Sequence, residues 1–292
     1  MLQEVMAHLD IKPGAIVLDA TAGAGGHLRS MCESAGPAGR AFGIDRDSRA
    51  HQSDAAGGLL KVFPDTLRLF KQPFSKIPEL LKEEGVPGVD AILCDLGVSS
   101  MQLDEADRGF SFQNDGPLDM RMADDGITAR EFLARSSVDE IADVLFYYGE
   151  ERKSRRIARA IKAKQPLPDS TLALAKIISQ ASGGRRGRIH PATKSFQAIR
   201  IAVNRELDEL DSLLESLPSI LNPGGRAAFI AFHSLEDRKV KRCFQAGGRN
   251  TGDNPPVWSI LTKKPIVASQ HEAAVNPRAR SAKLRVVERY TC

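Results

Sequence analysis

A glycine-rich loop beside an aspartate is the part of this sequence best suited to holding a cofactor. The apolar run at residues 15–18 ends on Asp19, and the loop that follows contains Gly23, Gly25 and Gly26. Small residues let a backbone approach a ligand closely, and glycine tolerates the positive φ that such a loop needs. Taken alone the loop is a weak signal, and Asp19 is as well explained as a turn-forming residue.

A second aspartate strengthens the cofactor hypothesis. Asp45 lies 22 residues after Gly23 at the end of the next apolar run, where a carboxylate can accept hydrogen bonds from both hydroxyls of a ribose. Leu28 stands where the dinucleotide pattern G-x-G-x-x-G has its third glycine. The carboxylate of Asp19 would repel a pyrophosphate but suits the ammonium and sulfonium charges of S-adenosylmethionine. The sequence therefore favours S-adenosylmethionine, with a dinucleotide-dependent oxidoreductase as the rival.

Four apolar runs predict the strands that position these residues. They cover residues 15–18, 41–44, 89–94 and 227–232, and the polar residues at their ends are Asp19, Asp45, Asp95 and His233. Open parallel sheets bind ligands beyond the carboxyl ends of their strands. We therefore expect an α/β fold with a mainly parallel sheet and a site at one edge of it.

The long interval between the third and fourth runs predicts an inserted domain. About 130 residues separate them, far more than an ordinary crossover connection needs. Helix-like stretches occur at 129–147 and 151–164, and one amphipathic helix is expected over 195–217. We divide the chain into residues 1–107 and 195–292, which form the main domain, and residues 108–194, which form a mainly helical substrate-recognition domain.

Composition and charge narrow the class of protein. The chain has 292 residues, of which 42% are hydrophobic, and its four cysteines form no C-x-x-C pair, so neither a metal site nor a disulfide framework is expected. No segment resembles a signal peptide or a membrane span, which favours a cytoplasmic location. Residues 149–200 include thirteen Lys and Arg but only three acidic residues. Residues 238–292 include twelve Lys and Arg and again three acidic residues. Such runs favour a phosphate-rich partner over a merely solvated basic face.

Several long motifs together resemble the RsmH/MraW family of bacterial methyltransferases. They occur in the order of the family and cover nearly the whole chain, at residues 19–27, 43–47, 95–104, 108–112, 116–122, 190–198, 232–238 and 276–283. The resemblance implies a Rossmann-like class I methyltransferase with an inserted helical domain. It also implies N4-methylation of a cytidine in small-subunit (16S-type) ribosomal RNA near the decoding centre.

The resemblance assigns roles to particular residues. The family's cofactor-binding residues fall on Gly25, Gly26, His27, Asp45, Phe74, Asp95 and Gln102, to which the loop itself adds Asp19 and Gly23. Family members usually carry a His-x-Pro-Val stretch ahead of the equivalent of residues 1–5, and the sequence starts after it. If that stretch helps to close the substrate pocket, we expect weaker activity without it.

Asp95 is our candidate for the group that accepts hydrogen bonds from the substrate amine. His233, Ser234 and Glu236 are secondary candidates for substrate positioning. Pure cofactor binding is the alternative for Asp95, and a packed capping role for His233. General amino-methyltransferases use an Asp/Asn/Ser-Pro-Pro-aromatic tetrapeptide here, whereas this sequence has residues 95–98 as Asp-Leu-Gly-Val.

Two groups of cations are expected to contact RNA phosphates. They are Arg185, Arg186, Arg188 and Lys194 in the first group and Arg278, Arg280 and Lys283 in the second. Phosphate contacts position RNA without reading its sequence. The expected partner is small-subunit ribosomal RNA within a ribosomal subunit, with no membrane partner and with a homodimer left open. The alternative functions are a methyltransferase for other RNA, DNA or a small molecule, and an inactive RNA-binding relative.

Overall fold

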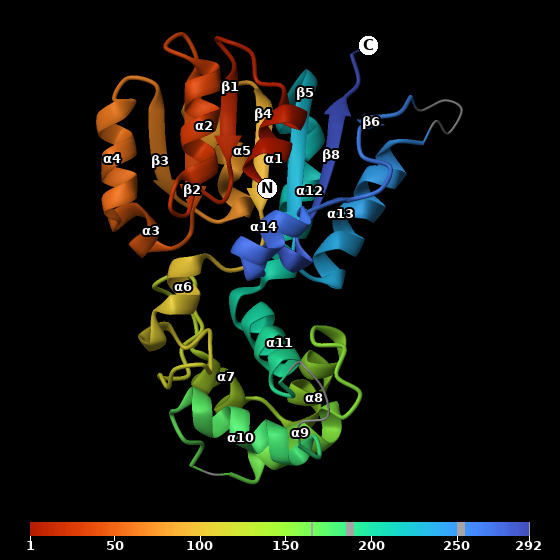
Figure 1. Ribbon diagram of the computed structural model, residues 1–292. Helices are drawn as coiled ribbons and strands as arrows, with labels where there is room; N and C mark the ends of the chain where they lie inside the picture. Colours follow the sequence, from red (N-terminus) through yellow and green to blue (C-terminus); the bar gives the residue numbers. More distant parts are fainter. Residues whose placement is uncertain (165, 185–189, 250–254, 292) are drawn as a thin grey trace. The chain divides into compact units, whose positions relative to one another are not determined.

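The computed structural model describes residues 1–164, 166–184, 190–249 and 255–291 and divides the chain into two compact units. The first unit comprises Met1–Gly97 and Asp208–Cys292, and the second comprises Val98–Leu207 (Figure 1). The second unit is longer at both ends than the insertion proposed over 108–194. Side chains such as Leu103 and Ile199 explain the difference, because they pack against the hydrophobic core of that unit.

The first unit is built on a sheet that, over the described residues, has eight strands. Its parallel strands are β1 (Ile16–Asp19), β2 (Arg40–Asp45), β3 (Leu67–Lys71), β4 (Val89–Asp95) and β5 (Leu221–Ala231). Three antiparallel strands follow, namely β6 (Trp258–Ile260), β7 (Ile266–Val267) and β8 (Lys283–Arg289). The strand order is β3-β2-β1-β4-β5-β8-β6, with β7 also paired to β8. The predicted mainly parallel α/β sheet is confirmed.

Helices cover both faces of this sheet, as alternation along the strands requires. Leu18 of β1 joins one hydrophobic core and the preceding Val17 joins the other, because successive side chains point to opposite faces. The first core includes α5 (Ile77–Glu83), α12 (Glu206–Ile220) and α13 (Ser234–Gly247). The second core includes α1 (Leu2–Leu9), α2 (Gly26–Ala35) and α4 (Asp54–Val62). The described part of this unit also contains four short helices, α3 (Ser48–Gln52), η1 (Phe74–Lys76), α14 (Gln270–Val275) and η3 (Pro277–Ser281).

The second unit is mainly helical. Its helices are α6 (Ser100–Asp104), η2 (Ala106–Arg108), α7 (Ala129–Arg135), α8 (Val138–Tyr147), α9 (Ser154–Lys162), α10 (Thr171–Ala181) and α11 (Thr193–Asn204). Thr128 and Ser137 are the N-caps of α7 and α8, and each forms a capping box. Because a second helix starts at Ser137, the helical stretch predicted over 129–147 is divided into two helices.

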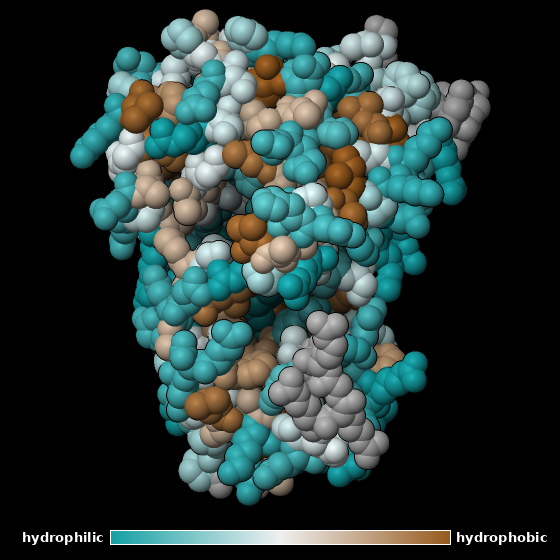
Figure 2. Space-filling model, viewed as in Figure 1, coloured by the Kyte–Doolittle hydropathy of each residue, from teal (hydrophilic) through white to brown (hydrophobic). Residues whose placement is uncertain are grey.

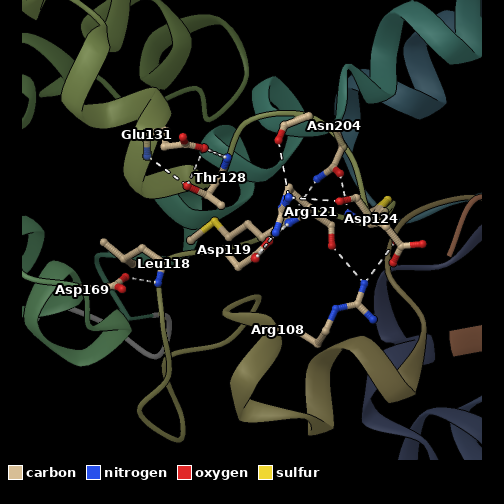
Figure 3. Close-up of polar contacts among 12 residues, drawn as sticks. Arg108, Leu118, Asp119, Arg121, Asp124, Thr128, Glu131, Asp169 and Asn204 are labelled. Atoms are coloured by element: carbon tan, nitrogen blue, oxygen red, sulfur yellow. Dashed lines mark hydrogen bonds and ion pairs between the residues drawn. The ribbon is translucent and has the colours of Figure 1, made fainter. Parts of the chain in front are cut away.

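Polar contacts stabilise the loop between η2 and α7 in the second unit (Figure 3). Arg121 makes a two-pronged contact with Asp119, at 2.9 and 2.8 Å. The guanidinium of Arg108 donates to the carbonyl of Arg121 at 2.9 Å, and buried Asn204 accepts from Met122 N–H at 2.7 Å. The family motif at residues 116–122 therefore has a structural role within this unit.

One predicted helix is wrong in its extent. The helix expected over 195–217 is two helices, α11 and α12, separated at Arg205. Arg205 has φ 50° and ψ 37°, in the left-handed region, and it ends α11 there. The apolar pattern runs on across the break because both helices bury their apolar sides, one in each unit. Periodicity alone therefore could not reveal the change of direction.

Candidate active site

The carboxyl ends of β1, β2 and β4 lie side by side at one edge of the sheet. β1 stands between β2 and β4, so the strand order reverses beside it. In the register of the sheet, Asp19 of β1 is opposite Gly43 of β2 and Leu93 of β4. Asp95 of β4 is opposite Ile230 of β5. Ligands of open α/β sheets bind at such a reversal. The fold thus places the three predicted aspartates where a ligand is expected.

The loop after β1 uses its glycines as the sequence predicts. Gly23 and Gly25 have φ values of +48° and +77°, a region that side chains other than glycine seldom adopt. A Cβ on Gly25 would also lie 2.2 Å from Cδ1 of Leu59. At Gly26 an added Cβ meets no atom within 4 Å, so close packing within the protein does not explain that glycine.

Asp45 connects the glycine loop to β2 through hydrogen bonds. Its two carboxylate oxygens accept hydrogen bonds from the backbone N–H groups of Gly23 and Asp47, each at 2.9 Å. Burial raises the pKa of Asp45, although the two backbone hydrogen bonds oppose the shift. Each oxygen keeps a further lone pair, which is the acceptor capacity that a ribose diol requires.

A small pocket is lined by Asp45 and by Gly23 and Gly25 of the glycine loop. Its apolar wall includes Leu28, Leu59 and Leu69, and His51 lies in it with Nε2 2.9 Å from the carbonyl oxygen of Asp45. His51 was not predicted as a site residue, because it follows no strand end and belongs to no glycine pattern.

Thr21 links Asp19 to Asp95 and is the second residue that the sequence did not single out. Its hydroxyl accepts a hydrogen bond from the Asp95 N–H at 2.7 Å and donates to the Asp19 carboxylate at 3.3 Å. The Thr21 N–H donates to the same carboxylate oxygen at 3.0 Å. Because Asp19 is only 1% exposed, burial raises its pKa to about 7, against the effect of these hydrogen bonds.

Replacing Thr21 tests this bridge. Thr21→Val keeps the side-chain shape but removes the acceptor for the Asp95 N–H and one donor to Asp19. We expect the free energy of unfolding to fall by about 1–3 kcal/mol, the cost of leaving buried polar groups unpaired. Thr21→Ser keeps the hydroxyl and should retain most of the stability in denaturant titrations. Equal losses in the two variants would show that the hydroxyl makes no such contribution.

Asp95 and His27 face one another and keep unused hydrogen-bonding capacity. His27 Nδ1 lies 3.8 Å from Asp95 Oδ2, beyond hydrogen-bond distance. The other two atoms, Asp95 Oδ1 and His27 Nε2, are buried and have no hydrogen-bond partner among the described residues. Burial raises the pKa of Asp95 to about 7, helped by the charges of Asp19 and Glu236, whereas burial lowers the pKa of His27.

These residues fit S-adenosylmethionine. Buried polar atoms are nearly always paired, so the unpaired oxygen of Asp95 and nitrogen of His27 indicate contacts that a ligand completes. Asp19, Asp45 and Asp95 all have raised pKa values, and a cationic ligand would stabilise their ionised forms. The three aspartates form an acidic edge at the carboxyl ends of β1, β2 and β4. The negative charge of this edge suits the ammonium and sulfonium of the cofactor, and the two acceptor oxygens of Asp45 suit its ribose.

Two residues of the predicted cofactor set belong to elements other than β1, β2, β4 and the glycine loop. Phe74 begins η1 in the first unit and packs partly buried against the core under α5. Gln102 belongs to the second unit, where it is 5% exposed and closes the capping box of α6 by accepting from the Ser99 N–H at 3.0 Å. Their contacts with a cofactor stay predictions.

The secondary catalytic candidates form the start of α13. His233 is the N-cap of this helix, with Nδ1 3.4 Å from the Glu236 N–H and Nε2 3.0 Å from Glu236 Oε1. Glu236, only 3% exposed, accepts from the Phe232 N–H at 2.9 Å. Ser234 is exposed in the first turn. This geometry gives His233 and Glu236 a capping role, and any part in substrate positioning stays a prediction.

The predicted RNA-contacting cations have different surroundings. Arg185, Arg186 and Arg188 lie outside the described residues. The ammonium of Lys194 donates to the carbonyl of Glu150 at 3.3 Å. In the first unit, Arg278 and Arg280 are exposed, while Lys283 lies 3.4 Å from Asp237. Within the described part of the chain, no helix is long and apolar enough to cross a membrane.

Comparisons with known proteins identify the family of this chain. The model of the MraW methylase family matches residues 1–290. A protein of Nitrobacter hamburgensis named Ribosomal RNA small subunit methyltransferase H is 46% identical over 98% of this chain and 89% of its own length. A protein of the same name from Sorangium cellulosum is 48% identical, with the same coverage of both chains.

Solved structures are more distant. The crystal structure of an rRNA methylase from Streptococcus thermophilus is 10% identical, with a TM-score of 0.41 over 99% of this chain and 94% of that one. The evidence for the family therefore comes from the sequence match over nearly the whole chain, together with the strand order and the acidic edge. The chain belongs to the MraW methylase family and is an S-adenosylmethionine-dependent methyltransferase.

Proposed function

We propose that this enzyme methylates the exocyclic N4 amine of a cytidine in small-subunit ribosomal RNA. The name of the relatives that share 46–48% of their residues with this chain supports the RNA substrate. The observation that carries the choice of an amine is Asp95, which presents a buried, unpaired carboxylate oxygen at the reversal of strand order. Such an oxygen suits an N–H donor.

The chemical difficulty lies in the acceptor amine. Its lone pair is delocalised into the cytosine ring, so the amine must be oriented with that lone pair in line with the methyl group. Bound S-adenosylmethionine supplies a methyl group activated by its sulfonium. Orientation of two reactants can contribute up to about 7–11 kcal/mol. The fold provides it by fixing Asp95 on a buried strand, with its backbone N–H tied to Thr21.

Asp95 would act on the amine through its ionised form. The carboxylate accepts a hydrogen bond from an amine N–H, which favours a tetrahedral nitrogen and stabilises the positive charge that develops on it. The same oxygen then takes the proton that the amine releases. With a pKa of about 7 in the cofactor-free protein, the carboxyl is about half ionised at neutral pH and basic enough to accept a proton, and a bound cation favours its ionised form.

The wider setting follows from the substrate. We infer that the cytidine lies near the decoding centre, that the RNA is presented within a ribosomal subunit, and that the reaction takes place in the cytoplasm. The basic residues assigned from the sequence would hold the RNA backbone, including Lys194 in the second unit and Arg278 and Arg280 in the first.

Transfer of labelled methyl groups tests the substrate class. The full chain is incubated with labelled S-adenosylmethionine and one of three acceptors: unmodified small subunits, free small-subunit ribosomal RNA, or duplex DNA. We expect label in the ribosomal acceptors and none in DNA. Label in DNA alone would favour a DNA methyltransferase. Cofactor binding without transfer to any acceptor would favour an inactive RNA-binding relative.

A further inference from the structure

Helix α13 carries a row of exposed polar and basic side chains, of which only Ser234 has been given a candidate role above. Counting 100° per residue, its exposed polar positions fall within about 100° of the helix circumference. This basic stripe consists of Ser234, Arg238, Lys241, Arg242 and Gln245, all exposed. It holds three cations and no carboxylate, over about 16 Å of helix at 1.5 Å per residue.

The acidic residues of the same helix point elsewhere and are already paired. Glu236 is buried in the helix cap. Asp237 lies 2.7 Å from Arg285 and 3.4 Å from Lys283, both on β8. The remaining cation of the helix, Lys239, forms an ion pair with Asp211 of α12. The carboxylates of α13 are thus engaged in the cap or in ion pairs, while Lys241 and Arg242 are exposed to solvent.

The basic stripe also begins at the edge of the sheet that carries the candidate active site. Its first residue, Ser234, follows His233 directly after β5, and Ile230 of β5 is level with Asp95. An RNA whose base reaches Asp95 must carry its backbone past this edge. Figure 1 shows α13 running from this end of β5, and the surface over α13 is largely hydrophilic in Figure 2.

We propose that the basic stripe of α13 binds the phosphate backbone of the RNA substrate next to the methylated nucleotide. The inference rests on the proposed RNA substrate. Clustered cations bind phosphates through charge and through release of condensed counterions, which makes the affinity depend on salt. The alternative, a solvated face with no partner, predicts no such dependence on these particular residues.

The test compares two pairs of exposed cations in the same unit. Lys241→Gln with Arg242→Gln removes two charges from the stripe, and Lys61→Gln with Lys82→Gln removes two from helices α4 and α5 as the matched control. Binding of transcribed small-subunit ribosomal RNA to the full chain is measured across a range of salt concentrations. Binding of S-adenosylmethionine is measured alongside and should be unchanged in both variants.

We expect the stripe variant to reduce the slope of log affinity against log salt by about 1.4, since each single-strand phosphate contact contributes about 0.7. The control pair should keep the slope of the unmodified chain. Equal slopes for the stripe variant and the control would overturn this inference while leaving the RNA substrate intact. An unmodified chain that binds neither this RNA nor unmodified small subunits would overturn both proposals.

Discussion

Asp95→Asn is expected to lower the rate of methyl transfer by about 10²–10⁴-fold, the usual contribution of a positioned proton acceptor. Asparagine keeps the size of the side chain but cannot take a proton at the same oxygen. The loss should appear in kcat under saturating cofactor, measured as labelled methyl incorporated into ribosomal RNA. If Asp95 served only to bind the cofactor, affinity for S-adenosylmethionine would fall instead and kcat would recover at saturation.

The pH dependence of the unmodified enzyme follows from the same carboxyl group. The pKa of Asp95 is raised to about 7 in the free protein, so the active ionised form disappears as the pH falls through 7. We expect kcat/KM for S-adenosylmethionine, which reports the free enzyme, to fall toward tenfold per pH unit below about 7. The pKa of Asp19 is also raised to about 7, and a requirement for both ionised carboxyls would steepen the fall toward a hundredfold per pH unit.

Stability gives an independent check on Asp95. Its pKa is about 7 in the folded protein and about 3.8 when unfolded, so its contribution is most favourable below pH 4 and is lost as the pH rises through 7. Asp95→Asn should therefore raise the Tm of the cofactor-free protein at pH 8 and leave it nearly unchanged at pH 4. A shift of three pH units corresponds to about 4 kcal/mol, which solvent reduces because the side chain is 31% exposed.

Asp45→Ala is expected to weaken binding of S-adenosylmethionine by about 10–150-fold. The variant loses charge-assisted hydrogen bonds to the ribose, worth about 1.5–3 kcal/mol, and leaves the N–H groups of Gly23 and Asp47 without their acceptor. Isothermal titration gives the affinity directly. Asp65→Ala, which removes an exposed carboxylate before β3, is the matched control and should bind normally.

A graded series sharpens the interpretation of Asp45. Asp45→Asn keeps one carbonyl acceptor and should fall between Ala and the unmodified chain, whereas Asp45→Glu should bind poorly because the longer side chain cannot keep both backbone contacts. Unchanged affinity in Asp45→Ala would place the ribose elsewhere. A loss of the same size in Asp65→Ala would show that overall charge, rather than the position of Asp45, controls binding.

The central strands could be predicted because their sequences are apolar on both faces. The runs at 15–18, 41–44 and 89–94 match β1, β2 and β4 closely, since helices cover both sides of this part of the sheet. The run at 227–232 falls on the second half of β5, whereas β3 and β8, which the sequence did not predict, carry charges that hide them. β3 contains Arg68 and Lys71 at one margin of the sheet. In β8 the charge of Arg285 is compensated by Asp237, a partner on α13 that no local pattern reveals.

The site was predictable to the extent that its residues end strands. Asp19, Asp45 and Asp95 follow from that rule, and the structure brings their strand ends together. Thr21 was hidden because its role is a hydrogen bond across 74 residues of sequence. His233 also follows a strand, but it is at the same time the N-cap of α13. Its ring therefore accepts a hydrogen bond from the backbone of that helix. Position alone could not separate a cap from a substrate contact.

The most direct test of the account is the identity of the modified nucleoside. Unmodified small subunits are incubated with the full chain and S-adenosylmethionine, and the RNA is digested and analysed by mass spectrometry. We expect cytidine to gain one methyl group, as a product that co-elutes with N4-methylcytidine, and to gain it about 10²–10⁴-fold more slowly with the Asp95→Asn variant. A methyl group on carbon 5 of cytosine, on the ribose or on another base would contradict the assignment of Asp95 to an exocyclic amine.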